Sequence, residues 1–369
     1  MSFEKALETV AATAAANATD VDRGTFPTAT VRALADAGLF GLISSTEVGG
    51  MGQGVAEAAR VVERLARECG STAMVVCMHY AATAVIEQHG PEDVRRAIAA
   101  GKHLSTLAFS EPGSRSHFWA SLNTASADGG NVRISGKKSF VTSAHFADSY
   151  VWSTRPVTGG ELSTLWLVPR ETAGLRIDKS FDGLGLRGND SAPVTAEDVR
   201  LPQSARLGED GGGFGVMMGL VLPSFNVLNA SVSAGLMEAA VERTAKHVGG
   251  AKLEHAGSSL ADLPTLRAFV ARMRIKTDQT KALNADTIAA LAAGRADATL
   301  RVLESKAAAG EAAAEVGDLA MRVCGGAAYR KDVGVERVFR DSRAALVMAP
   351  TTDVLYDFIG KAVCGLPLF

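Results

Sequence analysis

The spacing of apolar residues changes twice along this chain, and this double change limits the fold more than any other feature. Residues 1–103 and 211–369 repeat apolar side chains at intervals of three and four, which is the period of an amphipathic helix. Residues 104–210 contain short β-branched or aromatic runs separated by glycine, proline, aspartate and asparagine, which is typical of strands. The order of helices, strands and helices predicts an α+β chain with segregated layers.

The clearest helical segments are long, and their length indicates how they pack. They are Val55–Cys69, Ser71–His89, Phe214–Val248, Leu260–Ala293 and Ala296–Cys324. Long helices with small residues on their faces usually pack as a bundle, and they can also bury a face between subunits. We therefore predict an N-terminal helical domain (1–103), a middle antiparallel β-barrel or β-sandwich domain (104–210) and a C-terminal four-helix bundle (211–369).

Charge and cysteine content exclude several classes of protein. Lysine and arginine total 38 and aspartate and glutamate total 40, so the formal net charge is −2. This near-balance argues against nucleic acid or an anionic membrane as a bulk partner. No run of about 18 apolar residues predicts a membrane span, and the N-terminus, MSFEKALETV, is unlike a secretory signal. The four cysteines form no C-x-x-C pair and the histidines no H-x-x-x-H pair, which predicts reduced thiols in a cytoplasmic protein without a metal site.

Seven short motifs then follow one another along nearly the whole chain. They are EVGGMG at Glu47–Gly52, AFSEPGSRS at Ala108–Ser116, ISGKKSFVTSA at Ile134–Ala144, LGLRGNDSAPVTAEDVRLP at Leu184–Pro202, LGEDGGGFGVM at Leu207–Met217, CGG at Cys324–Gly326 and VERVFRD at Val335–Asp341. In this order they resemble the motifs of the acyl-CoA dehydrogenase family; AFSEPGSRS, for example, is similar to the family's T-E-P-G-x-G-S segment. The resemblance implies a flavin enzyme with FAD as cofactor and FMN as the alternative.

The resemblance also implies which positions contact the cofactor. They are Leu107, Phe109, Ser110, Ser116, Phe140, Thr142, Arg322, Gly325, Gly326, Thr351 and Asp353. Phe140 would replace the tryptophan that shields the flavin ring, and Thr142 would form a hydrogen bond near the flavin N5. Ser116 would approach the pyrophosphate or the thioester arm. Arg322 would either pair with pyrophosphate oxygens or remain a solvated helix charge.

The chain departs from the family at the catalytic position. The family usually presents a glutamate, followed by glycine and threonine, that removes the α-proton of a fatty acyl thioester. Here these three positions are Ala349, Pro350 and Thr351, and alanine cannot accept a proton. Family members that carry the base on the first long C-terminal helix place it just before an arginine, where this chain has Phe225 and Asn226.

Two further departures concern the cofactor. Leu253 and Ala256 stand where the family has the arginine and phenylalanine that meet the cofactor from the partner subunit. Asp353 stands where a flavin-contacting glutamine is common. The resemblance therefore implies altered cofactor contacts together with a missing base.

Several polar residues near the matched motifs are candidates for a replacement base. His117 follows EPGSRS and His145 follows FVTSA, and an imidazole with a pKa near neutrality suits proton transfer. Ser143 is a candidate because flavin monooxygenases of this fold often keep serine and histidine in this region and lack the glutamate. The remaining polar candidates are His79, Asp148 and Asp353. Each of these side chains is also compatible with a purely structural role.

Three functions remain open from the sequence. The first is an FAD-dependent oxidoreductase that acts on a small acyl thioester, such as an acyl-CoA, with a relocated or unneeded base. The second is a flavin-dependent monooxygenase of the same fold, and the third is a non-catalytic partner subunit of a heteromeric dehydrogenase. The resemblance also implies an electron-accepting flavoprotein or a flavin reductase as partner, and a homodimer or homotetramer.

Overall fold

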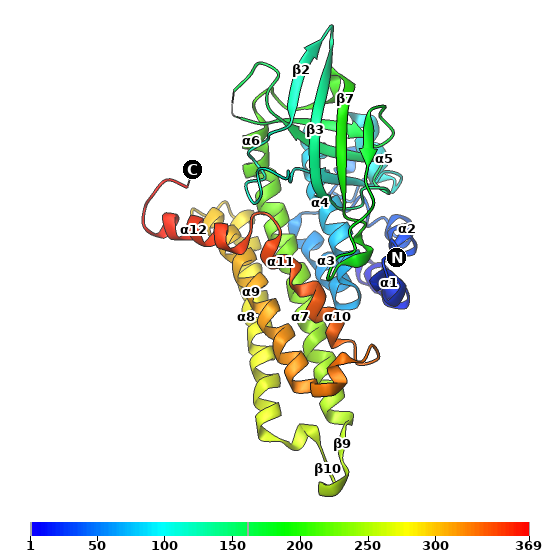
Figure 1. The fold of residues 1–369 in the computed structure, drawn as a ribbon, viewed down its shortest axis with the longest axis vertical. Coiled ribbons are helices and arrows are strands. Elements are labelled where there is room, and N and C mark those ends of the chain that lie inside the picture. The colour runs from blue at the N-terminus through cyan, green and yellow to red at the C-terminus, as the bar shows by residue number, and fades with distance from the viewer. Residues whose placement is uncertain (1, 161, 369) are drawn as a thin grey trace.

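The computed structural model describes residues 2–160 and 162–368, and it arranges them in the predicted order of helices, strands and helices (Figure 1). The N-terminal layer contains α1 (Phe3–Asp22), α2 (Thr28–Asp36), α3 (Val55–Glu68), α4 (Gly70–His89) and α5 (Glu92–Ala99). The apolar stripe of α3 is buried, while α4 is buried on nearly all sides, because other elements surround it. The α+β prediction with segregated layers is therefore confirmed.

The middle layer consists of two open four-stranded sheets. Its strands are β1 (Ser105–Ala108), β2 (Thr124–Asp128), β3 (Asn131–Val141), β4 (Ser149–Thr154), β5 (Thr164–Pro169), β6 (Leu175–Ile177), β7 (Ala192–Pro202) and β8 (Arg206–Leu207). One sheet has the order β1-β4-β5-β8 and the other β2-β3-β7-β6, and neither closes into a barrel. All pairs are antiparallel except β1 with β4, because the chain leaves β1 to build β2 and β3 in the other sheet before it returns.

The C-terminal layer is built around three long helices. Its elements are α6 (Gly213–Val216), α7 (Leu222–Gly250), the hairpin β9 (Lys252–Leu253) and β10 (Ser258–Ser259), α8 (Pro264–Ala292), α9 (Ala298–Cys324), α10 (Val335–Ser342), α11 (Ala344–Val347) and α12 (Thr352–Val363). In Figure 1, α7, α8 and α9 form long columns below the strands, and the β9–β10 hairpin lies at the end of the molecule away from the sheets. The fourth side is a broken helix, α10 to α12, that packs along α9.

Helix α7 is the centre of this layer, and it is unusually apolar. The segment Gly213–Gly250 is long and apolar enough, by length and composition alone, to cross a membrane, which the sequence analysis did not expect. However, 61% of its most apolar window is buried inside the protein. Contacts of α7 with α3, α4, α8 and α9 account for this burial, so the apolar composition is explained by the role of α7 as the core helix.

A glycine sets the distance between α7 and α3. A Cβ atom on Gly235 would lie 2.3 Å from the carbonyl oxygen of Glu63 and 2.6 Å from the Cβ of Ala66. Both distances are shorter than atoms tolerate, so the two helices can approach this closely only because residue 235 has no side chain.

This close approach generates a stability prediction. Gly235→Ala should lower the free energy of unfolding by about 1–3 kcal/mol, because the added methyl group forces the two helix backbones apart. Gly360→Ala in exposed α12 is the matched control, since a Cβ there meets no atom within 4 Å. This control should raise the free energy of unfolding by about 0.4–1 kcal/mol through helix propensity. Denaturant titration checks both values, and equal effects of the two substitutions would contradict the packing argument.

Candidate functional site

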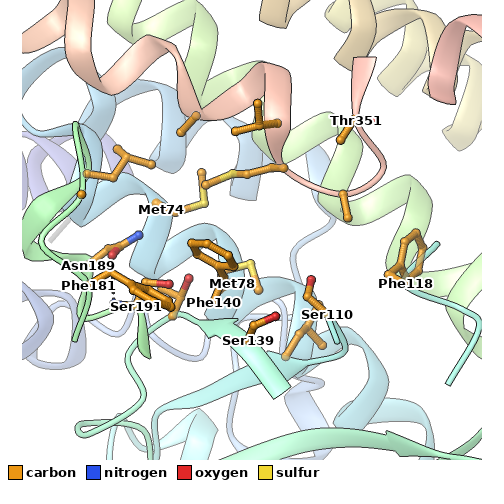
Figure 2. Close-up of a pocket in the computed structure, with 18 of the residues that line it drawn as sticks. Met74, Met78, Ser110, Phe118, Ser139, Phe140, Phe181, Asn189, Ser191 and Thr351 are labelled. Carbon is orange, nitrogen blue, oxygen red and sulfur yellow. Dashed lines mark hydrogen bonds between the residues drawn. The ribbon is translucent and has the colours of Figure 1, made fainter. Parts of the chain in front are cut away.

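A cavity of about 940 Å³ lies between the middle β layer and the helical layers. Its walls come from α4, from the segments after β1 and β3, from the loop before β7, and from the α10–α12 region. Figure 2 shows Met74 and Met78 reaching into this space from α4, with Thr351 on a loop at the facing side. The volume lies at the upper end of the range for small-molecule and cofactor sites.

The structure brings most of the predicted cofactor positions together in this cavity. The predicted residues that line it are Leu107, Phe109, Ser110, Ser116, Phe140, Thr142, Ala349 and Thr351. Ser116 of the middle layer and Thr351 of the C-terminal layer are in direct contact. The backbone N–H of Thr351 donates to Ser116 Oγ at 2.8 Å, and Ser116 Oγ lies 3.1 Å from Thr351 Oγ1. Their roles as cofactor contacts stay predictions, but one cavity holds all of them.

Phe140 and Thr142 fit the flavin ring that the resemblance implies. Phe140 is 66% exposed, which is unusual for a large aromatic side chain inside a sheet domain. The register of β3 against β7 shifts between Lys138 and Val141, and Phe140 takes a left-handed backbone with φ of 52°. This bulge turns the aromatic ring toward the cavity. The Thr142 hydroxyl makes no hydrogen bond within residues 2–160 and 162–368, so it is available to a ligand.

A buried ion pair holds the loop that carries Ser110 and Ser116. Lys138 Nζ lies 2.5 Å from Glu111 Oε1, and both side chains are almost completely buried. The other carboxylate oxygen of Glu111 accepts from the backbone N–H groups of Leu122 and Asn123, at 2.7 and 3.2 Å. Because Glu111 bonds to both ends of the loop, it fixes the loop's shape.

This same pairing removes the one acidic side chain of the cavity from proton transfer. Among the described residues that line the cavity, Glu111 is the only aspartate, glutamate or histidine. Its oxygens are engaged by Lys138 and by two backbone groups. The described cavity therefore presents no free carboxylate or imidazole, and Ala349 contributes only a methyl group.

The candidate bases lie elsewhere. His145 does not line the cavity; its Nδ1 is 2.9 Å from Asp190 Oδ1, and its backbone N–H donates to Asp190 Oδ2 at 2.7 Å. Ser143 is buried outside the cavity, and its hydroxyl has no hydrogen-bond partner in the described part of the chain. His117 and Asp353 line a second hollow of about 490 Å³ beside α12.

Two further polar candidates have structural roles. His79 is buried between the carbonyl oxygen of Phe40 and the backbone N–H of Ser105, and burial lowers its pKa to about 4, so it is neutral at pH 7. Asp148 accepts from the backbone N–H of Leu104 at 2.7 Å. Neither residue lines the cavity.

The remaining cofactor positions also lie outside the cavity of their own chain. The guanidinium of Arg322 stacks over the Phe269 ring at 4.5 Å from its centroid. Gly325 and Gly326 follow the end of α9 and are not part of the cavity wall. The hairpin with Leu253 lies at the opposite end of the molecule from the sheets (Figure 1). The cofactor contacts of Arg322, Gly325 and Gly326 stay predictions, and Leu253 stays a departure from the family pattern.

Lys306, which none of the sequence motifs indicated, positions the turn between α11 and α12. Its side chain is completely buried, and Nζ donates to the carbonyl oxygens of Ala345, Met348 and Pro350 at 3.3, 3.0 and 2.7 Å. Burial lowers its pKa to about 7. The sequence held one signal for this role: Lys306 lies on a stripe of α9 that otherwise contains apolar and small residues. A charge at such a buried position requires hydrogen-bond partners.

Comparison with known proteins places this fold and cavity in context. The chain matches three family models in order: acyl-CoA dehydrogenase N-terminal domain over residues 2–101, middle domain over 106–199 and C-terminal domain over 211–364. The mitochondrial short-chain specific acyl-CoA dehydrogenase of Bos taurus is 28% identical over 336 residues, which cover 89% of this chain and 81% of the relative. The cyclohex-1-ene-1-carbonyl-CoA dehydrogenase of Syntrophus aciditrophicus (strain SB) is 28% identical over 357 residues, which cover 95% and 86%.

Solved structures share the whole fold. Butyryl-CoA dehydrogenase from Megasphaera elsdenii superposes with a TM-score of 0.90 at 21% identity, over 99% of this chain and 100% of that chain. The FAD complex of PigA superposes with a TM-score of 0.88 at 20% identity, over 99% of this chain and 98% of that chain. At these identities the likeness establishes the fold.

Lys306 generates a prediction about pH. Because its pKa falls from 10.5 to about 7 on folding, the unfolded chain binds more protons than the folded chain between these values. Stability should therefore rise with pH across this window, and below about pH 7 the full penalty of burying the charge is present. Lys306→Met should remove this part of the slope when unfolding is measured by denaturant titration from pH 7 to 10.

Lys281 is the matched control for this measurement. It forms ion pairs with Glu63 and Glu238, and its pKa is raised. Its stabilising charge is therefore retained throughout the window, so Lys281→Met should leave the slope between pH 7 and 10 unchanged. If the Lys306→Met protein kept the wild-type slope of stability against pH, Lys306 would not be the group with the lowered pKa that causes it.

Proposed function

Because the chain belongs to the acyl-CoA dehydrogenase family, we propose that it acts on an acyl thioester as an FAD-dependent oxidoreductase whose own side chains supply no proton acceptor in the cavity. The flavin-dependent oxidoreductase class and the FAD cofactor follow from the family and its structural neighbours. The thioester substrate and the absence of a base are the proposed part.

One observation carries this proposal: Ala349, at the position that the motif comparison assigns to the catalytic glutamate, presents only a methyl group to the cavity. Ala349 lines the wall beside Thr351 and Met348, and Glu111 is committed to its buried ion pair. A positioned general base commonly contributes about 10²–10⁴ in rate, so α-proton abstraction by the usual route should be severely impaired. We therefore infer a reaction at the acyl group that needs no protein base because a group other than the α-proton leaves, as in a desulfination.

The chain's own residues have separable tasks in this proposal. FAD, when bound, supplies two-electron redox chemistry. Phe140 provides an aromatic wall and Thr142 a free hydroxyl for the flavin ring. The apolar side chains of Met74, Met78 and Phe225 line the rest of the space, and they would exclude water from around the acyl group.

The alternatives receive less support from the geometry. A monooxygenase that used Ser143 and His145 would need them at the flavin, but His145 is bonded to Asp190 and neither residue lines the cavity. A non-catalytic subunit would not need a cavity of about 940 Å³ with a free Thr142 hydroxyl. By analogy with the family, an electron-transferring flavoprotein is the proposed electron acceptor for any substrate whose conversion leaves the flavin reduced.

Anaerobic titration with a panel of acyl-CoAs tests the proposal. Saturated acyl-CoAs should perturb the flavin spectrum on binding but bleach it at least about 10²-fold more slowly than they bleach the Ala349→Glu protein, which regains a carboxylate at the catalytic position. Ala344→Glu is the control, because Ala344 also lines the cavity but lies five residues earlier, at the start of α11. Rapid bleaching of the unmodified protein would refute the missing-base part, and no spectral response to any thioester would refute the substrate class.

A further inference from the structure

Four arginines line the cavity, and they differ in how their charges are compensated. Three form ion pairs: Arg187 with Asp182, Arg340 with Asp22 and Glu336, and Arg343 with Asp318. Arg115 is the exception, since it has no ion pair and no hydrogen-bonded partner in the part of the chain that the structure describes. An uncompensated guanidinium on a cavity wall is suited to an anionic ligand group.

The backbone at Arg115 adds a second argument. Its φ is 48°, in the left-handed region that residues with a Cβ atom avoid. In the motif that AFSEPGSRS resembles, T-E-P-G-x-G-S, this position is glycine, which adopts such a backbone freely. An arginine therefore stands here at a cost in stability that glycine would not incur, which points to a role for its side chain.

The position of Arg115 indicates the ligand group that it meets. It directly precedes Ser116, whose hydroxyl is bonded to Thr351, and all three residues line the cavity. Other cations are fewer than the family pattern implies: Leu253 replaces the arginine that the motif comparison expects from the partner subunit, and Arg322 stacks over Phe269 outside this cavity. Among the described residues of the cavity wall, Arg115 is therefore the cation that remains free to pair with an anionic group of FAD such as the pyrophosphate.

We propose that Arg115 pairs with the pyrophosphate of FAD within the same chain, and that it takes over the charge that the partner subunit would otherwise supply. Its planar guanidinium can form two parallel hydrogen bonds to phosphate oxygens. The inference concerns cofactor retention alone, and it is independent of the substrate proposed above.

Flavin titration of the deflavinated protein tests this inference, with FAD and with riboflavin, which lacks the pyrophosphate. In Arg115→Gly the affinity for FAD should fall about tenfold to a hundredfold while the affinity for riboflavin stays unchanged. Arg115→Lys should recover part of the loss, because it keeps the charge but not the forked geometry. The melting temperature of deflavinated Arg115→Gly should not decrease, since glycine relieves the backbone strain.

Asp198→Gly is the matched control, because Asp198 has a similar left-handed φ of 49° but lies on β7 outside the cavity. It should change neither flavin affinity. An equal loss of FAD and riboflavin affinity in Arg115→Gly would show that the residue only shapes the loop, and it would overturn the proposal. Unchanged FAD affinity would overturn it as well.

Discussion

The site depends on one interaction, the contact of a buried ammonium group with three carbonyl oxygens. Lys306 lies on α9 in the core of the helical layer, yet it binds the turn that carries Ala349 and Thr351. A buried charge is tolerated only when hydrogen bonds replace the lost water, so the turn cannot move away without leaving the lysine unsatisfied. The backbone N–H of Thr351 then donates a hydrogen bond to Ser116, which connects this fixed turn to the β domain.

This arrangement explains how the cavity accommodates an alanine at position 349, where the motif comparison expects a glutamate. The turn is held by backbone carbonyls, which every residue type has, so a methyl group at Ala349 leaves its path intact. The loop on the other wall is held by the buried Glu111–Lys138 pair, which does not involve Ala349 or its turn. Scaffold and chemistry are thus separable in this protein, and membership of the family does not by itself establish the family's reaction.

Much of the fold was predictable because its signals are local. The periods over Val55–Cys69 and Ser71–His89 correspond to α3 and α4, since burial of one stripe or of a whole helix leaves a direct pattern in the sequence. Strand β2 leaves little signal in the sequence, because TASAD is short, mostly exposed and stabilised by its pairing with β3. The parallel pairing of β1 with β4 was also missed, because strand order depends on contacts between distant segments.

For the site, the sequence alone determined which side chains are present. Ala349 stands where the family motif has a glutamate, and Arg115 stands where the motif has a glycine. The sequence also indicated Phe140, Thr142, Ser116 and Thr351 by their motifs. Only the tertiary structure decided which groups face the cavity and which charges are already compensated. Glu111 and Arg115 both line its wall, but a buried lysine neutralises the first and no described residue pairs with the second. Reactivity depends on these partners, which come from distant parts of the chain.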